Sequence, residues 1–217
     1  AVGRTRGENH LRPESVDAFE IGFRSYRRGV TFNAAAFYYS YDDIQVQALQ
    51  PSTGLTALTN AARAEIYGIE MEGQVPLDRA FTLRGGFGYT HAKYTDFPGA
   101  LLTFPRTSGC GANPNLPCGN TQSPADASGN DMVRTPRWTA NLSLDYAGNV
   151  GNGELRGSVT GSYNSGFYWD AGNRLEQPDY VLVNASLSWG PDNSFWRVGL
   201  WGRNLLDETY QLYLADT

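Results

Sequence analysis

Apolar and polar residues alternate along most of this chain with a period of two. The apolar side of segment 66–75 carries Tyr67 and Ile69. Its polar side carries Glu70 and Glu72. Successive side chains of a β-strand point to opposite faces, so this spacing predicts strands with one apolar and one polar face. No segment shows a competing helical spacing.

The same alternation along the whole chain predicts an all-β, antiparallel fold of about eight long strands. Several of them exceed the usual strand length of about 5–6 residues. The predicted strands are 16–27, 30–48, 59–75, 80–96, 135–147, 153–169, 179–190 and 194–205. Strands of this length favour a transmembrane β-barrel.

The connections between the predicted strands alternate between short and long. Short turns rich in Gly, Pro, Asn and Asp are predicted at 28–29, 76–79, 148–153 and 190–193. Longer loops are predicted at 49–58, 98–134, 170–178 and from 206 onward. All short turns therefore fall at one end of the sheet and all long loops at the other, which is typical of a transmembrane barrel.

Aromatic residues gather near both ends of the predicted strands, as in the aromatic girdles of membrane barrels. At the long-loop end they are Tyr38, Tyr39, Tyr41, Tyr89, Tyr94, Tyr163, Phe167, Tyr168 and Trp169. At the short-turn end they are Tyr26, Tyr146, Trp189 and Trp196. A soluble sandwich with a core of aromatic residues is the alternative that alternation alone leaves open.

The amino-acid composition further narrows the classes of protein to which this chain can belong. Charged residues make up 18% of the 217 residues, against about 25% in soluble domains. The chain contains 25 Gly and 13 Tyr. No apolar run approaches the roughly 18–20 residues of a membrane helix. The net charge is −5 with no block of Lys or Arg, so no nucleic-acid partner is predicted.

Four segments carry recognisable motifs. They are Leu11–Ser15 (LRPES) with Asp17 and Phe19–Gly22, Asn60–Ala62 with Ile66–Gly73, Thr135–Thr139 (TPRWT), and Gly202–Tyr210 (GRNLLDETY). In this order, the segments resemble the "LKPE-S-D-YEIG", "NAG-A-I-GVE-E", "TP-W" and "G-NLFDK-Y" motifs of TonB-dependent outer-membrane receptors. The resemblance covers nearly the whole chain.

The resemblance implies that residues 1–217 are a fragment, the C-terminal portion of such a receptor's barrel. The family's N-terminal plug and its energy-coupling segment would precede Ala1, and the closing strand would follow Thr217. The strands would form a partial, curved barrel that can remain open. The implied location is the outer membrane of a Gram-negative bacterium, with outer-membrane lipid, a TonB-type energy-coupling protein and a ferric siderophore as partners.

On this interpretation the polar face lines the lumen of the barrel. The charged residues predicted to face the lumen are Glu20, Arg24, Glu70, Glu72, Arg84, Asp145, Arg197 and Arg203. Contact with the plug or the ligand is one role, and solvated ion pairs within the wall are the alternative. Glu70 and Glu72 also have a spacing that suits a glycosidase, but no set of substrate-positioning residues accompanies them.

The predicted long loops hold the candidate ligand-binding residues. They are Tyr94, Phe97, Arg106, Tyr168, Trp169 and Arg174. Arg pairs with anionic oxygens and aromatic rings stack on flat ligands, whereas girdle anchoring and loop packing are the alternative roles. Cys110 and Cys118 are predicted to form a disulfide within the longest loop. No metal or cofactor site is predicted.

The resulting functional hypothesis is a receptor and transporter that takes up a scarce solute and is not an enzyme. A ferric siderophore is the first candidate for this solute. Three alternatives remain open at this point. They are a passive porin-like channel, an outer-membrane or secreted enzyme with carboxylates on its wall, and a soluble carbohydrate-binding sandwich.

Overall fold

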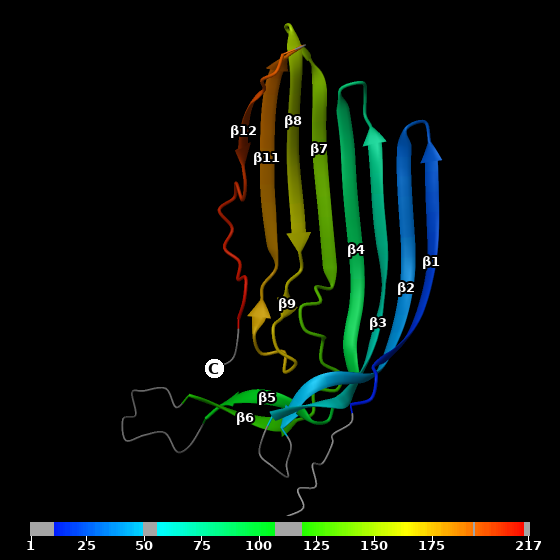
Figure 1. Ribbon diagram of the computed structural model, residues 1–217, viewed down its shortest axis with the longest axis vertical. Coiled ribbons are helices and arrows are strands. Elements are labelled where there is room, and N and C mark those ends of the chain that lie inside the picture. Colours follow the sequence, from blue (N-terminus) through cyan, green and yellow to red (C-terminus); the bar gives the residue numbers. More distant parts are fainter. Residues whose placement is uncertain (1–10, 50–55, 107–118, 193, 215–217) are drawn as a thin grey trace, which may run out of the picture.

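The computed structural model describes residues 11–49, 56–106, 119–192 and 194–214. Within these ranges the chain forms a single antiparallel eight-stranded sheet with the order β1-β2-β3-β4-β7-β8-β11-β12 and two small hairpins (Figure 1). The described residues include no helix long and apolar enough to cross a membrane. Strands β1 and β12 are the two edges of the sheet, which is open.

Consecutive strands of the large sheet are neighbours in sequence order, as the alternation predicted. The strands of this sheet are β1 (Ser15–Arg27), β2 (Val30–Leu49), β3 (Thr56–Pro76), β4 (Phe81–Asp96), β7 (Trp138–Val150), β8 (Gly153–Asn164), β11 (Tyr180–Pro191) and β12 (Val198–Gly202). The hairpins pair β5 (Ala100–Pro105) with β6 (Asn120–Ala125), and β9 (Phe167–Tyr168) with β10 (Glu176–Gln177).

The register of the strands sorts the side chains onto two faces. Arg24 of β1 pairs with Asn33 of β2, and Asn33 pairs with Glu72 of β3. One step along, Ile21 pairs with Ala36. Residues opposite each other in paired strands share a face. We call the side that carries Arg24 and Glu72 the polar face, and the side that carries Ile21 the apolar face.

The apolar face presents large side chains that nothing in the described chain covers. Ile21 is 75% exposed, Leu142 is 57% exposed and Leu200 is 77% exposed. Burial of apolar surface stabilises by roughly 25 cal/mol per Å², so a face of this kind is stable only against another apolar phase.

All short turns lie at one end of the sheet and all long connections at the other (Figure 1). The tightest turn joins β1 to β2 through Arg28 and Gly29, both with positive φ (53° and 84°). Two such residues are typical of a type I′ hairpin turn. In the next turn, N–H groups of Phe81 and Ala80 donate to Asp78 Oδ1 at 2.7 Å. These bonds lower the pKa of Asp78 from its usual value.

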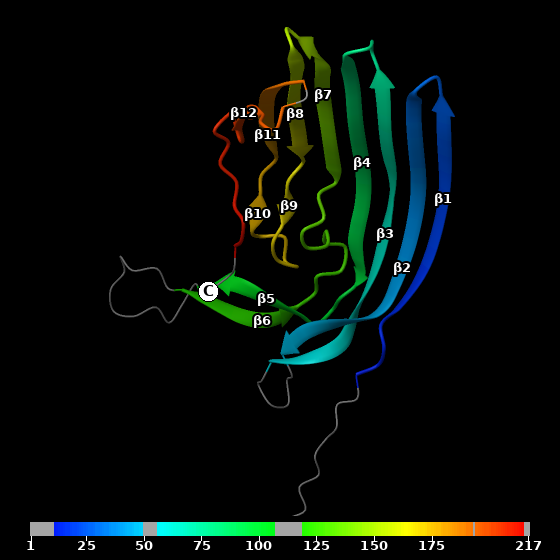
Figure 2. The same ribbon diagram turned by 45° about the horizontal axis from the view of Figure 1, so that its top comes forward.

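A small core forms at the long-loop end, where the β5–β6 hairpin folds across the ends of β2 and β3 (Figure 2). Its buried members are Ala62, Ala64, Tyr94, Phe97, Ala100, Leu102 and Ala127. Ala64 pairs with Tyr94 in register with the polar face. The polar face is therefore covered by apolar packing at this end and open along the rest of its length.

Several strand boundaries differ from the prediction. The predicted strand 153–169 ends at Asn164, because Gly166 has a φ of 78° and Phe167–Tyr168 pairs with Glu176–Gln177 in its own hairpin. The predicted strand 194–205 is only Val198–Gly202. The predicted start at 135 moves to Trp138. The segment 98–134, predicted as a loop, contains β5 and β6.

The aromatic residues near the strand ends divide between the two faces. Trp138 contacts Tyr89 at the long-loop end, with ring centroids 4.4 Å apart, and both lie on the apolar face. Trp189 and Trp196 contact each other at the short-turn end, at 5.8 Å. Other predicted girdle residues share the polar face instead, since they pair in register with it. These are Tyr26, Tyr39, Tyr41 and Tyr94.

A close approach of β3 and β4 generates a stability prediction. A Cβ on Gly68 would lie 2.1 Å from the carbonyl oxygen of Tyr89 and 2.7 Å from Cζ of Phe37. We expect Gly68→Ala to lower the free energy of unfolding by about 1–3 kcal/mol, because the two strands must separate. The midpoint of urea unfolding measures this. Gly161→Ala is the matched control, since no atom lies within 4 Å of its Cβ position. Equal midpoints for the two variants would contradict the close approach.

Candidate functional site

The structure places the eight charged residues assigned to the lumen on one face of the sheet. Glu20 and Arg24 lie on β1, Glu70 and Glu72 on β3, Arg84 on β4 and Asp145 on β7, and all six share the polar face by register. Arg197 and Arg203 flank β12 in step with Gly199 and Trp201, which pair with Ser188 and Ser186 of the same face. Whether this face lines a closed lumen remains a prediction.

Hydrogen bonds run across the strands of the polar face in rows. Arg24 Nε donates to Asn33 Oδ1 at 3.1 Å, and Asn33 Nδ2 donates to Glu72 Oε1 at 2.7 Å. In the adjacent row, Arg84 Nη1 lies 2.6 Å from Asp145 Oδ2 and Arg84 Nε donates to Gln74. Exposed pairs of this kind each contribute about 0–1 kcal/mol, so the rows order the wall more than they stabilise it.

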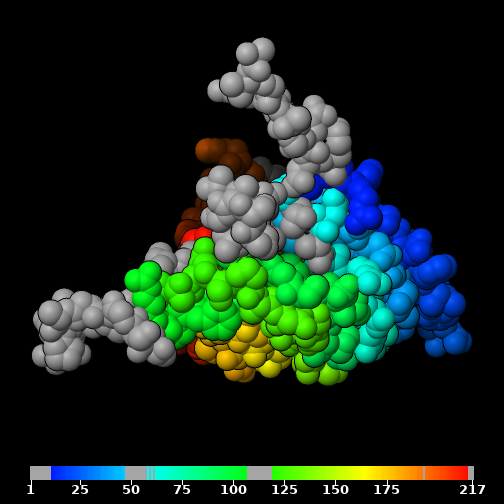
Figure 3. All heavy atoms as spheres, turned by 90° about the horizontal axis from the view of Figure 1, so that it is seen from below, coloured from blue at the N-terminus to red at the C-terminus, as the bar shows by residue number. Residues whose placement is uncertain are grey.

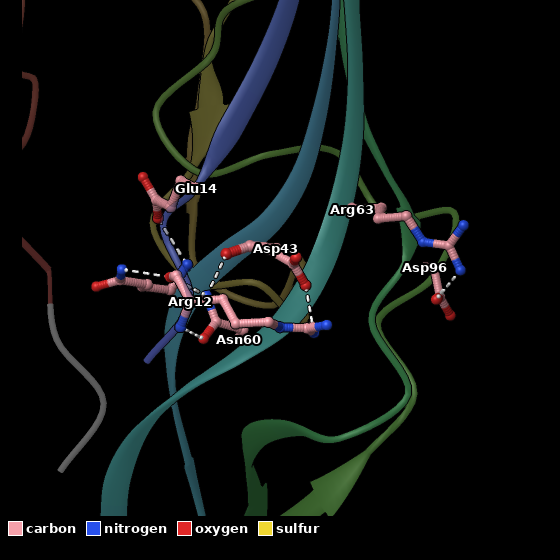
Figure 4. A network of polar contacts seen from close by, with 7 residues as sticks. Arg12, Glu14, Asp43, Asn60, Arg63 and Asp96 are labelled. Atoms are coloured by element: carbon pink, nitrogen blue, oxygen red, sulfur yellow. Dashed lines mark hydrogen bonds and ion pairs between the residues drawn. The ribbon is translucent and has the colours of Figure 1, made fainter. Parts of the chain in front are cut away.

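Two of the sequence motifs meet at the long-loop end of β1, β2 and β3 (Figure 4). Asn60 of β3 accepts the N–H of Arg12 on Oδ1 at 2.7 Å. Its Nδ2 donates to the carbonyl oxygens of Arg12 and Asp43, at 2.8 and 2.7 Å. Glu14 Oε1 accepts the N–H of Gln45 at 2.6 Å. We call these five residues the motif corner.

The motif corner holds an irregularity in β2. Asp43 has a φ of 58°, and the pairing of β2 with β3 shifts between Tyr41 and Ile44. A bulge leaves backbone groups without ladder partners and bends its strand. Here Asn60 and Glu14 supply partners to these groups, and Arg12 forms an ion pair with Asp43. The corner therefore fixes where the end of β2 bends over the sheet.

A pocket opens beside the small core, between the β5–β6 hairpin and the segment that follows β9. Arg134, Trp169 and Tyr213 lie on its walls, with Ala100 and Leu102 from β5. Its volume is about 510 Å³. We call it the mouth pocket. In Figure 3, which views this end directly, the green residues of β4 to β6 adjoin the yellow and orange residues near β9 and β10.

The loops around the mouth pocket are joined by side-chain hydrogen bonds. Asn173 Nδ2 donates to the carbonyl of Asp131 at 2.9 Å, and the N–H of Asp131 donates to Asn173 Oδ1 at 2.8 Å. Asp170 Oδ1 accepts the N–H groups of Arg174 and Leu175. Segments far apart in sequence are thus held side by side.

The structure brings three of the six predicted ligand residues to the mouth pocket. Tyr94, Phe97 and Trp169 line it, and the first two are almost fully buried in the small core. Tyr168 lines a separate hollow beside Thr90. Arg106 and Arg174 are exposed and do not line the mouth pocket. Burial makes Tyr94 and Phe97 part of the pocket's support as well as its surface.

Arg134 and Tyr213 also line the mouth pocket, although neither is among the predicted ligand residues. Arg134 directly precedes the TPRWT motif and has a φ of 56°, and its N–H donates to the carbonyl of Tyr168 at 2.8 Å. Its guanidinium lies 5.0 Å from the ring of Trp169 and 5.8 Å from that of Tyr213. The sequence feature that could have identified Arg134 is its position next to a recognisable motif at the end of a predicted loop.

Other predicted features stand apart from this site. Cys110 and Cys118 lie outside the described residues. Among the residues that the structure describes, no group of three or more His, Cys, Asp or Glu side chains is arranged to hold a metal ion. Glu70 and Glu72 line a shallow hollow on the polar face with Gly86.

The motif corner leads to a second stability prediction. Asn60→Ala removes three hydrogen bonds, and we expect the free energy of unfolding to fall by about 2–3 kcal/mol. Asn149→Ala at the exposed end of β7 is the control, since none of the described residues bonds its side chain. Urea unfolding compares the two, and a loss no greater than the control's would rule out the role given to Asn60.

The joined loops lead to a prediction about local order. Asn173→Ala removes both bonds to Asp131 and places a less suitable residue at a φ of 53°. We expect amide hydrogen exchange in 168–175 to accelerate about tenfold or more. Asn173→Gly separates the two causes, because glycine tolerates the backbone conformation but makes neither bond. Unchanged exchange in both variants would show that these bonds do not hold the loops together.

Comparisons with known proteins agree with this architecture. The profile of the family described as "TonB dependent receptor-like, beta-barrel" matches residues 1–205. The pesticin receptor of Yersinia enterocolitica is 24% identical over 196 residues, which are 90% of this chain and 25% of that receptor. The chain therefore spans about a quarter of the length of this curated relative.

Solved structures share the fold. The ferric yersiniabactin uptake receptor of Yersinia pestis superposes with a TM-score of 0.71 at 21% identity, covering 92% of this chain and 26% of that one. The siderophore receptor PiuA of Acinetobacter baumannii gives a TM-score of 0.65 at 21% identity, covering 90% and 25%. With its two-faced sheet and segregated loops, this chain belongs to the TonB-dependent receptor β-barrel family.

Proposed function

We propose that this chain is the C-terminal portion of the barrel of an outer-membrane receptor that imports a scarce solute. The solute that we propose first is a ferric siderophore. The observation that carries the proposal is the eight-stranded sheet with one exposed apolar face and one hydrogen-bonded polar face, in a chain of this family. In the proposed barrel the apolar face contacts lipid and the polar face lines the lumen.

The apolar face has the form that lipid contact requires. Its side chains are exposed along the middle of β1, β7, β8, β11 and β12, and aromatic contacts mark both ends. Beyond Tyr38 on this face, Glu65 and Lys93 pair across β3 and β4. Charged residues appear where a strand leaves the hydrocarbon layer, so this pair marks the proposed outer boundary of the membrane.

The matched proteins supply the substrate class of the proposal. The matched structures include receptors for ferric yersiniabactin, ferric preacinetobactin and ferric enterobactin. We infer a ferric chelate for this chain because a pocket with one cationic and several aromatic side chains opens among its long connections. Cations and rings suit an anionic ligand with flat groups.

The proposed role is binding and transport without covalent chemistry. Energy would reach the receptor through a TonB-type coupling protein that acts on a plug encoded upstream of this segment. The polar face, with Glu20, Arg24, Glu70 and Glu72 in its hollow, would contact that plug or the passing solute. A passive porin-like channel is the competing proposal, and it requires no energy for import.

Uptake of a radioactive ferric chelate tests the proposal. Cells with the complete receptor gene and a deletion strain are given a panel of ⁵⁵Fe chelates, with and without an uncoupler of the proton gradient. We expect accumulation of at least one chelate to depend on both the gene and the gradient. Accumulation that survives the uncoupler supports the passive channel. Equal accumulation by both strains for every chelate overturns a role in iron uptake.

A further inference from the structure

A groove crosses the apolar face of β7, β8 and β11 near the short-turn end. Gly157 and Ala185 lie at its bottom, because one has no side chain and the other a small one. Leu144, Val159 and Leu187 stand beside them on the same face. The groove has a volume of about 530 Å³, and little polar surface reaches it. We call it the apolar groove. Its size and lining are those of a small-molecule site.

Two aromatic rings close the apolar groove at the short-turn end. Phe81 and Tyr146 line it and contact each other, with ring centroids 4.9 Å apart. A Cβ on Gly148 would lie 2.6 Å from the hydroxyl of Tyr146, so this hydroxyl points along β7 toward the short turn. Within the described ranges, no hydrogen bond engages it. An apolar ring with a polar tip of this kind is typical of a membrane interface.

The turn that precedes Phe81 adds a cation to the same end of the groove. Exposed Arg79 lies two residues before Phe81, in a turn that the N–H of Leu77 closes by donating to the carbonyl of Phe81 at 2.9 Å. The neighbouring Asp78 accepts the N–H groups of Ala80 and Phe81. No ion pair formed within the described part of the chain includes Arg79. Its guanidinium is therefore available to an anion from outside.

We propose that this site binds one phospholipid molecule. An acyl chain lies in the apolar groove, and the phosphate accepts hydrogen bonds from Arg79 and from the hydroxyl of Tyr146. Burial of hydrocarbon stabilises the chain, and a guanidinium pairs well with phosphate oxygens. The inference rests on the proposed function only in placing the apolar face in a membrane. It goes beyond that function by assigning a fixed lipid to the outer wall.

Other occupants satisfy only part of this site. An apolar side chain from a second copy of the chain would fill the groove and leave Arg79 and Tyr146 without partners. A neutral lipid would do the same. Only an amphiphile with a long hydrocarbon chain and an anionic head uses the groove, the cation and the hydroxyl together, and a phospholipid is the membrane component with this chemistry.

Photo-crosslinking of the full-length receptor in lipid vesicles tests the site. The probe is a trace of phosphatidylglycerol with a diazirine in one acyl chain, and diacylglycerol with the same chain is its uncharged counterpart. Mass spectrometry maps the labelled peptides. We expect the charged probe to label the peptides that contain Leu144, Val159 and Leu187 more strongly than the apolar face of β1 and β2. We expect the uncharged probe to show no such preference.

Three variants alter the parts of the site separately. We expect Arg79→Gln to lower labelling of the groove by the charged probe about tenfold, because a charge-assisted hydrogen bond is lost. Tyr146→Phe removes only the hydroxyl, and we expect a loss of severalfold. Ala185→Leu fills the groove, and we expect a loss as large as that for Arg79→Gln.

Each variant has a matched control on the same protein. Arg28→Gln removes a cation from the neighbouring short turn. Ala36→Leu adds the same bulk to the apolar face of β2, where Ala36 pairs with Ile21 outside the groove. We expect both controls to label as the parent does. Heat-modifiable migration in gels confirms that each variant is folded.

The outcomes separate this inference from the proposed function. Equal labelling of the groove and of β1 and β2 in the parent overturns the lipid site, and so does labelling that Arg79→Gln and Tyr146→Phe leave unchanged. Receptor dimers that Ala185→Leu abolishes, with no label in the groove, overturn it in favour of a second copy. No labelling of any strand by either probe overturns the membrane placement as well. Selective labelling that depends on Arg79, in cells that import no ferric chelate, supports the lipid site and overturns iron uptake.

Discussion

Inter-strand hydrogen bonds of the eight-stranded sheet constrain everything else in this molecule. Because side chains of paired strands share a face, one register decides which residues meet lipid and which meet water. A shift of a single residue would exchange the two faces of a strand. The polar rows through Asn33 and Arg84 form only in the observed register, and so does the continuous apolar face that contains Ile21 and Leu142.

At the long-loop end the polar face carries apolar residues instead of charged ones, although the register of the strands continues unchanged. Small residues occupy that face on β3 and β4, with Ala62, Ala64 and Ala92 almost fully buried. Their size lets Tyr94, Phe97 and the β5–β6 hairpin pack closely over the sheet. The motif corner directs this folding, because Asn60 ties Arg12 to the bulge at Asp43. A wall that is open and polar along most of its length thereby supports a structured mouth.

The predicted strands agree with the structure wherever alternation is uninterrupted. Alternation failed after Asn164, where Gly166 turns the chain and Phe167–Tyr168 forms a separate hairpin. It also failed in 98–134, because the pairing of β5 with β6 depends on a partner strand that the local pattern does not specify. Tyr39 and Tyr41 were interpreted as girdle residues from their position near a strand end, although their register puts them on the polar face.

The sequence by itself determined the strands, their two faces and the separation of short turns from long loops. These follow from a period of two and from turn-forming residues, which act between near neighbours in the chain. Tertiary structure alone decided that Arg134 lies close to the rings of Trp169 and Tyr213, and that Asn60 lies beside Arg12. Contacts of this kind join segments distant in sequence, and they exist only once the sheet has brought the strand ends to a common edge.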